Sequence, residues 1–165
     1  MDVLNEWILS NFNLTMFMLA VVLILLHKSM VGRRLANEEI VYRWLVLFPL
    51  GLTNIYLFAT QTFLYFYAVQ NAFLTFSSVF QTCLAYLALG VIAISSFNAS
   101  YGFRLATVTA NVIFLFGCAA QSIYLLTLKG SYDLTQLGSL VWLNQIILPC
   151  LLILCMIGLS RKPRR

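Results

Sequence analysis

Charged residues are scarce in this sequence. Asp, Glu, Lys and Arg make up 9% of its 165 residues, against about 25% in an ordinary soluble domain. Hydrophobic residues make up 62%, and the mean hydropathy is +0.92. A soluble fold needs far more polar side chains to cover its surface. The composition therefore excludes a soluble globular protein, a disordered chain and a nucleic-acid-binding domain. It predicts an integral membrane protein whose main partner is the lipid bilayer, with no nucleic acid.

Metal-binding and catalytic side chains are also few. The chain has one histidine, His27, and four cysteines without a CxxC pair, which are Cys83, Cys118, Cys150 and Cys155. Structural zinc sites use close pairs of such ligands, so no metal site is predicted, and the cysteines are expected to be small apolar side chains. Histidine and charged residues are absent from the long apolar runs, which argues against a proton-coupled pump or an ion pathway. No catalytic residue and no cofactor is predicted.

The remaining charges divide the chain into uncharged stretches at residues 7–26, 44–103, 105–128 and 134–160. A membrane-spanning helix needs about 20 mostly apolar residues. The stretch 44–103 is too long for one helix and divides near residues 70–78. We therefore expect an all-α bundle of five spans in a single membrane domain, residues 1–165. The expected spans are about 7–26, 42–66, 79–97, 104–128 and 138–159.

The distribution of basic residues predicts the orientation. With five spans and the N-terminus outside, nine of the ten Lys and Arg residues fall on the cytoplasmic side and only Lys129 falls outside, as the positive-inside rule requires. The C-terminus, with its basic tail at residues 161–165, is then cytoplasmic. The expected location is the cytoplasmic (inner) membrane, as a multi-pass protein. The first span is expected to be retained, because Asp2 and Glu6 precede it instead of the basic residues of a signal peptide.

Local signals add detail to the expected spans. Residues 37–39, Asn-Glu-Glu, resemble a helix start, because carboxylates are favoured at the positive end of the helix dipole. Pro49 and Pro149 lie inside expected spans and can kink them. Small residues that permit close approach between helices are Gly90, Gly117, Ala106 and Ala110.

Glutamines stand out among the polar side chains within the spans. Four spans carry one, namely Gln61, Gln81, Gln121 and Gln145, the last beside Asn144, and the first span carries Asn11 and Asn13 instead. At about 1.5 Å per residue, Gln81 lies about 12 Å outward of the centre of its span. The corresponding distance is roughly 6–9 Å for Gln61, Gln121, Gln145 and Asn13. An amide in hydrocarbon needs a hydrogen-bond partner, and amides at similar depth on different helices can supply one another.

Three interpretations of these amides remain open at the level of sequence. They can hydrogen-bond between helices, form the floor of a ligand-binding pocket open to the outer leaflet, or meet headgroups separately. We predict that Gln61, Gln121 and Gln145 face the bundle interior, at least two of them within hydrogen-bonding reach. Gln81 lies nearest the outer interface.

Four segments of the chain resemble a known family. They are RWLVLFPLGLTNIYLFATQTF, FQTCLAYLALGVIAI, FRLATVTANVIFLFGCAAQSIY and NQIILP, in that order over roughly residues 43–150. The pattern is similar to an uncharacterised bacterial family of small multi-span membrane proteins, known as a domain of unknown function. The resemblance implies a membrane location and a helical bundle, and it implies no established activity.

The function that these features favour is a non-enzymatic membrane protein that binds a lipid-like molecule or partner helices. One alternative is a small membrane oxidoreductase or quinone-linked accessory protein, which would need a bound cofactor because the chain supplies no ligand set of its own. Another alternative is a structural subunit of a larger membrane complex.

Overall fold

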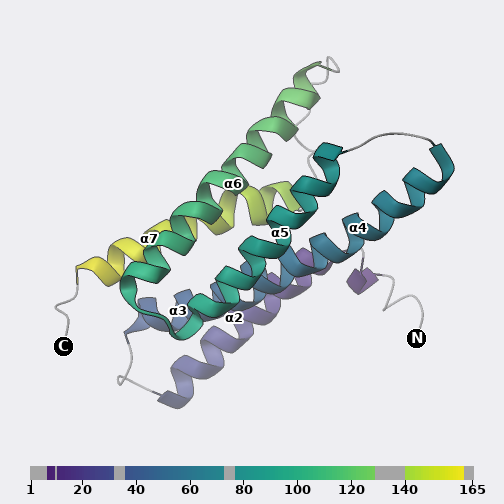
Figure 1. The fold of residues 1–165 in the computed structure, drawn as a ribbon. Coiled ribbons are helices and arrows are strands. Elements are labelled where there is room, and N and C mark those ends of the chain that lie inside the picture. The colour runs from purple at the N-terminus through teal and green to yellow at the C-terminus, as the bar shows by residue number, and fades with distance from the viewer. Residues whose placement is uncertain (1–6, 10, 32–35, 73–76, 129–139, 162–165) are drawn as a thin grey trace.

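The structure is a computed structural model that describes residues 7–9, 11–31, 36–72, 77–128 and 140–161. These residues are almost entirely helical and contain no strand, which confirms the all-α class (Figure 1). The elements are α2 (Phe12–Val31), α3 (Asn37–Leu45), η2 (Val46–Leu52), α4 (Thr53–Ala72), α5 (Ser77–Ser95), η3 (Ser96–Asn98), α6 (Tyr101–Leu128), η5 (Leu140–Ile147) and α7 (Leu148–Ser160).

Five helices of the described residues are long and apolar enough to cross a membrane, as the sequence predicted. They are Phe12–Met30, Asn37–Leu64, Phe80–Asn98, Tyr101–Leu128 and Val141–Ser160, and we call them spans one to five. Span two contains α3, η2 and most of α4 as one continuous helix. Its first helical element begins at Asn37, with Glu38 and Glu39 in the first turn, where their charge complements the helix dipole. The membrane orientation of the bundle stays a prediction.

Span two is the central helix of the bundle. Its first half packs against α2, α5 and α7, and the following α4 packs against α5 (Figure 1). Four of its side chains, Tyr42, Leu45, Val46 and Leu50, belong to the hydrophobic core and are almost completely buried. Because α2, α5 and α7 all pack against this helix, the core forms around its first half.

Two glycines allow span two and α5 to pack closely. A Cβ atom added to Gly90 on α5 would lie 3.0 Å from the backbone oxygen of Gly51 and 3.0 Å from Cγ1 of Ile55. A Cβ atom added to Gly51 would lie 2.6 Å from Cγ1 of Ile94. A larger residue at either position would push the two helices apart, which confirms the role predicted for Gly90. Gly117 has no such neighbour within 4 Å among the described residues.

Both intramembrane prolines accompany a π-helical segment. Pro49 lies inside η2, and Pro149 follows two residues after the end of η5. Proline has no N–H to donate and its ring displaces the carbonyl one turn back, and the wider π turn absorbs this disturbance without breaking the span. The sequence predicted a disturbance at these prolines, and the structure shows its form.

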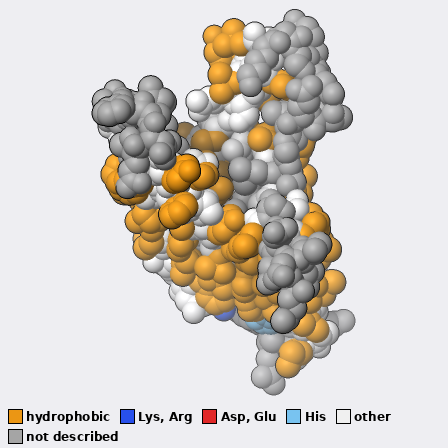
Figure 2. Space-filling model, turned by 90° about the vertical axis from the view of Figure 1, so that its right-hand side faces the viewer, with side chains coloured by type: hydrophobic (Ala, Val, Ile, Leu, Met, Phe, Trp, Pro, Cys, Tyr) orange, Lys and Arg blue, Asp and Glu red, His pale blue; other side chains and the backbone are white. Residues whose placement is uncertain are grey.

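The outer surface of the bundle is apolar. Figure 2 shows hydrophobic side chains over most of the described part of one face, with basic and histidine side chains near its lower edge. Exposed side chains include Met18, Leu25, Phe63, Ile113 and Leu154. So large an apolar surface is unfavourable in water but favourable in contact with lipid tails. The exposed side chains therefore agree with a membrane location.

Candidate functional site: an apolar groove between α6 and α7

Six of the amides named from the sequence occupy different environments. Asn13, Asn144 and Gln145 are buried, Gln61 is half-buried, and Gln81 and Gln121 are exposed. The assignment of these six residues to a ligand site stays a prediction.

The expectation that Gln121 faces the bundle interior was wrong. The buried residues of α6 recur every three or four positions and end with Leu115 and Ala119. Gln121 follows Ala119 by two positions, which is about 200° around an α-helix, so its side chain points away from the bundle. Gln81 stands in the same relation to buried Cys83 on α5. Depth along a span is readable from the sequence, but the direction of each side chain depends on which face packs inward.

Asn144 and Gln145 are adjacent in η5, which packs against α2 and α6. Asn144 is 2% exposed and Gln145 is 6% exposed, and Oδ1 of the first and Oε1 of the second are buried without a hydrogen-bond partner among the described residues. Adjacent positions on a helix point in different directions, so these two oxygens do not by themselves define a shared site.

A different amide pair lies at the centre of the bundle. Nδ2 of Asn54 on α4 donates a hydrogen bond of 3.3 Å to Oδ1 of Asn111 on α6, and Nδ2 of Asn111 donates to the backbone oxygen of Thr107 at 3.0 Å. Both asparagines are completely or almost completely buried. This pair was not predicted from the sequence, although the rule that a buried amide needs a partner applies equally to both residues.

An ion cluster joins the helices at the end of the bundle where α3 begins. Oε1 of Glu39 accepts a hydrogen bond of 2.8 Å from Nε of Arg43, and Oε2 accepts one of 2.6 Å from Nη1 of Arg104. Nη2 of Arg104 also donates to the backbone oxygen of Phe97, and its guanidinium lies 5.1 Å from the ring centroid of Tyr42. The cluster ties span two to span four.

Two further side-chain contacts fasten the same end of the bundle. The hydroxyl groups of Tyr42 and Ser96 are hydrogen-bonded at 2.9 Å, and Ser96 donates its own proton to the backbone oxygen of Ala93, so Tyr42 is the donor in the pair. Nε1 of Trp44 donates to Nδ1 of His27 at 3.1 Å. These groups are therefore occupied with one another, and we interpret this end as a structural clamp.

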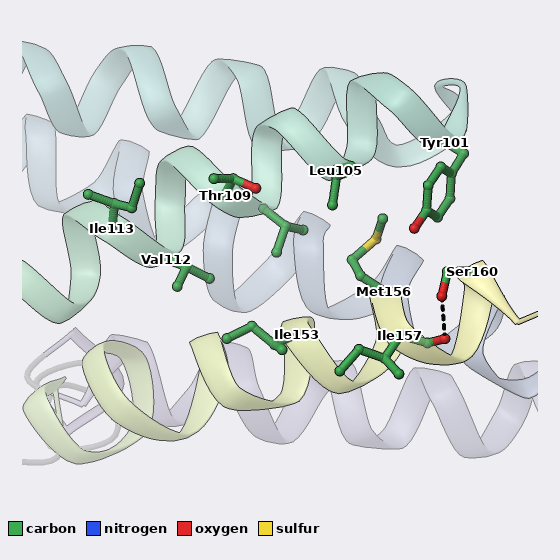
Figure 3. Close-up of a pocket in the computed structure, with 10 residues that line it drawn as sticks. Tyr101, Leu105, Thr109, Val112, Ile113, Ile153, Met156, Ile157 and Ser160 are labelled. Carbon is green, nitrogen blue, oxygen red and sulfur yellow. Dashed lines mark hydrogen bonds between the residues drawn. The ribbon is translucent and has the colours of Figure 1, made fainter.

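The candidate binding site is an open groove between α6 and α7. Its volume is about 310 Å³. Figure 3 shows the two helices side by side, with Tyr101 and Ser160 at one end of the groove and Ile113 at the other. The lining residues are Tyr101, Leu105, Val108, Thr109, Val112, Ile113, Ile153, Met156, Ile157 and Ser160.

Helical periodicity produces the two walls. On α6 the lining residues recur at intervals of three or four from Tyr101 to Ile113, and on α7 from Ile153 to Ser160, so each set forms one stripe along its helix. Val108 and Met156 are buried at the floor, while Ile113 and Ile157 are exposed at the rim. From residue 101 to residue 113 the groove extends about 18 Å along α6.

Polar groups in the groove are hydroxyls, and two of the three lie at one end. Ser160 Oγ donates to the backbone oxygen of Ile157 at 2.8 Å, and the Tyr101 side chain lies opposite on α6 (Figure 3). Thr109 lies further along α6. The lining holds no carboxylate, histidine or cysteine, and no cluster of three metal-ligating side chains occurs within the described part of the chain. The arrangement suits binding of an apolar chain.

Comparison with known proteins gives one match. A model described as "Family of unknown function (DUF6790)" matches residues 10–165. No curated protein and no solved structure matches the chain.

Proposed function

Because the chain belongs to this family of unknown function, DUF6790, we propose a function from its own geometry: it is a non-enzymatic integral membrane protein that binds a lipid-like molecule in the groove between α6 and α7. We also propose that it resides in the cytoplasmic membrane with its N-terminus outside. The unequal distribution of basic residues between the two ends of the spans supports that orientation.

One observation carries the lipid proposal. The groove is lined mainly by apolar side chains over about 18 Å of α6, which is close to the thickness of one leaflet of the hydrocarbon core, about 15 Å. It begins at the first residue of α6 and the last residue of α7. A lipid chain lying along the helices would enter at the interface and fill the groove toward the bilayer centre.

The energetics favour a shaped site over simple apolar contact. Lipid tails are as apolar as the groove walls, so burying a chain there gives little hydrophobic gain over the surrounding bilayer. Retention then depends on dispersion contacts with two walls at once and on polar contacts at the end of the groove. A side chain that fills the groove should therefore displace the lipid.

The test is lipid retention in native mass spectrometry after extraction into mild detergent. Ile153→Trp places a large ring in the groove, because Ile153 lines its α7 wall. Leu154→Trp is the matched control, because Leu154 is the adjacent residue, is exposed and does not line the groove. The wild type and Leu154→Trp should retain a lipid that Ile153→Trp loses.

Thermal stability in the same detergent shows whether the variants are folded. Thr109→Trp, on the opposite wall, provides a second groove-filling variant if Ile153→Trp does not fold. Equal lipid retention by the groove-filling variants and by Leu154→Trp would refute the proposal, as would the absence of retained lipid in the wild type.

A partner helix is the second candidate function, and the exposed face of α6 favours it. Ala106, Ala110, Gly117 and Gln121 lie on this face and are all exposed. Small residues let another helix approach closely, and an amide in hydrocarbon gains from a partner across such an interface. Gly117→Leu should then reduce a higher-mass assembly in native mass spectrometry, while Leu154→Trp should leave it intact. An unchanged assembly in Gly117→Leu would exclude this face as the interface.

A further inference from the structure

We propose that the groove selects an anionic phospholipid, whose phosphate lies beside Arg161 at the end formed by Tyr101 and Ser160. This inference rests on the proposed lipid-binding function and adds the headgroup to it. The apolar walls cannot distinguish one phospholipid class from another, because different classes carry the same acyl chains. Selection must therefore occur at the polar end of the groove.

That end is positioned at the interface by the helix boundaries. Tyr101 is the first residue of α6, Ser160 is the last residue of α7, and Arg161 follows directly as the residue that ends the helix. Arg161 is exposed. A chain that occupies the groove would thus bring its glycerol and phosphate to the level of two hydroxyl groups and one guanidinium, and arginine pairs well with phosphate oxygens.

The surrounding charge is complementary to an anion. Among the described residues this end of the bundle carries four basic residues, Lys28, Arg43, Arg104 and Arg161, against the two carboxylates of Glu38 and Glu39. Glu39 is paired with two of the arginines. The sequence after Arg161 continues with Lys162, Arg164 and Arg165.

Of the two described carboxylates, Glu38 is the one that packs against α7, and its position limits where the phosphate can lie. The Cβ position of Gly158 on α7 is 2.7 Å from Cγ of Glu38, so this carboxylate packs on the α3 side of α7. The groove lies on the α6 side of α7. The two faces are separated by α7 itself, and Arg161 is the described basic residue next in sequence to the groove lining.

The experiment compares two lipids that differ only in their headgroups. Phosphatidylglycerol and phosphatidylcholine with identical acyl chains are offered in equal amounts, and native mass spectrometry gives the ratio retained. The wild type should favour phosphatidylglycerol. Arg161→Gln should lower that ratio about fivefold, the effect of one basic residue near a membrane surface, while total lipid retention stays unchanged.

Lys28→Gln is the matched control, because Lys28 is exposed at the same end of the bundle but belongs to α2, which does not line the groove. It should leave the ratio unchanged. Ile153→Trp should abolish the excess of phosphatidylglycerol together with the bound lipid. A preference that survives Ile153→Trp would show that anionic lipid binds elsewhere and would overturn the inference.

The outcomes separate the headgroup from the groove. A wild type that retains both lipids equally, or an Arg161→Gln variant with the wild-type ratio, would refute the anionic site and leave the lipid groove standing. Equal total retention by Ile153→Trp and Leu154→Trp would refute the groove itself. Raising the ionic strength from 0.1 M to 1 M shortens the Debye length from about 10 Å to about 3 Å, so it should weaken the headgroup preference in the wild type.

Discussion

Spans two and four have the same length but different places in the bundle. Each has 28 residues, and their most apolar windows have similar mean hydropathies of 1.4 and 1.7, yet 50% of that window is buried in span two and 17% in span four. Hydropathy therefore predicts that both helices can cross a membrane, but it does not predict which one is central. Span two is central because α2, α5 and α7 all pack against it, with a close glycine contact to α5.

The two helices also differ in where their polar side chains lie. Span two buries Thr53 and Asn54, and its Glu39 pairs with Arg104 from span four. Span four turns its own buried polar residues, Thr107 and Asn111, toward the bundle and leaves Gln121 exposed on another face. The inward face of span four thus contributes to the core, whereas its other faces provide the groove and the exposed small residues.

The largest expected effect comes from breaking the ion pair between the two spans. Glu39→Gln removes the carboxylate that Arg104 contacts at 2.6 Å, where the Arg104 side chain is 9% exposed. Loss of one partner from a buried pair costs about 3–5 kcal/mol, and we expect the lower end because Glu39 retains some exposure. The melting temperature in detergent should fall strongly.

A matched variant sharpens this result. Arg43→Gln removes the other guanidinium from Glu39 but leaves the contact with Arg104 intact, and Arg43 is more exposed, at 24%. We expect a loss of about 0.5 kcal/mol, as for an exposed i,i+4 pair. If Glu39→Gln destabilises the protein no more than Arg43→Gln, the cluster does not link the two spans energetically.

The next effect compares a glycine at a close helix contact, Gly90, with a glycine on the exposed face of α6, Gly117. Gly90→Ala should destabilise the protein by about 1–3 kcal/mol, as overpacking does, because its new Cβ atom would meet the Gly51 backbone oxygen at 3.0 Å. Gly117→Ala should be neutral or stabilising by up to about 1 kcal/mol, since no described residue lies within 4 Å of its Cβ position. Thermal unfolding of the two variants in one detergent compares them directly, and equal effects would contradict the close approach.

The sequence was sufficient for the number of spans and for part of their detail. Runs of about 20 apolar residues bounded by charge define the spans, and the acidic residues after Asn37 marked a helix start that the structure contains. The pairing of Glu39 with Arg104 was not predictable, because 65 positions separate the two residues. Nearly uniform hydropathy around each helix hides which face packs inward, so Gln121 was misplaced and Asn54 and Asn111 were overlooked.

The coupling energy between the two asparagines that link the spans is expected to be smaller than the effects of Glu39→Gln and Gly90→Ala. Asn54→Leu removes the hydrogen bond of 3.3 Å that Oδ1 of Asn111 accepts in the wild type. A buried polar group without a partner costs about 1–3 kcal/mol. Replacing both residues should cost less than the sum of the single changes. A double-mutant cycle should give a coupling of about 0.6 kcal/mol, the average for such contacts in membranes. Strict additivity would show that the contact contributes nothing.

The smallest effect should come from the exposed amide of span four. Gln121→Leu alters an exposed side chain about 200° around α6 from buried Ala119, so the stability of the isolated chain should change by no more than about 0.5 kcal/mol. Melting temperatures of Gln121→Leu and Asn111→Leu, measured together, compare an outward with an inward amide on one helix. A loss for Gln121→Leu as large as that for Asn111→Leu would mean that Gln121 contacts a partner in the purified sample. Such a loss would favour the partner-helix function, because Gln121 is exposed among the residues that the structure describes.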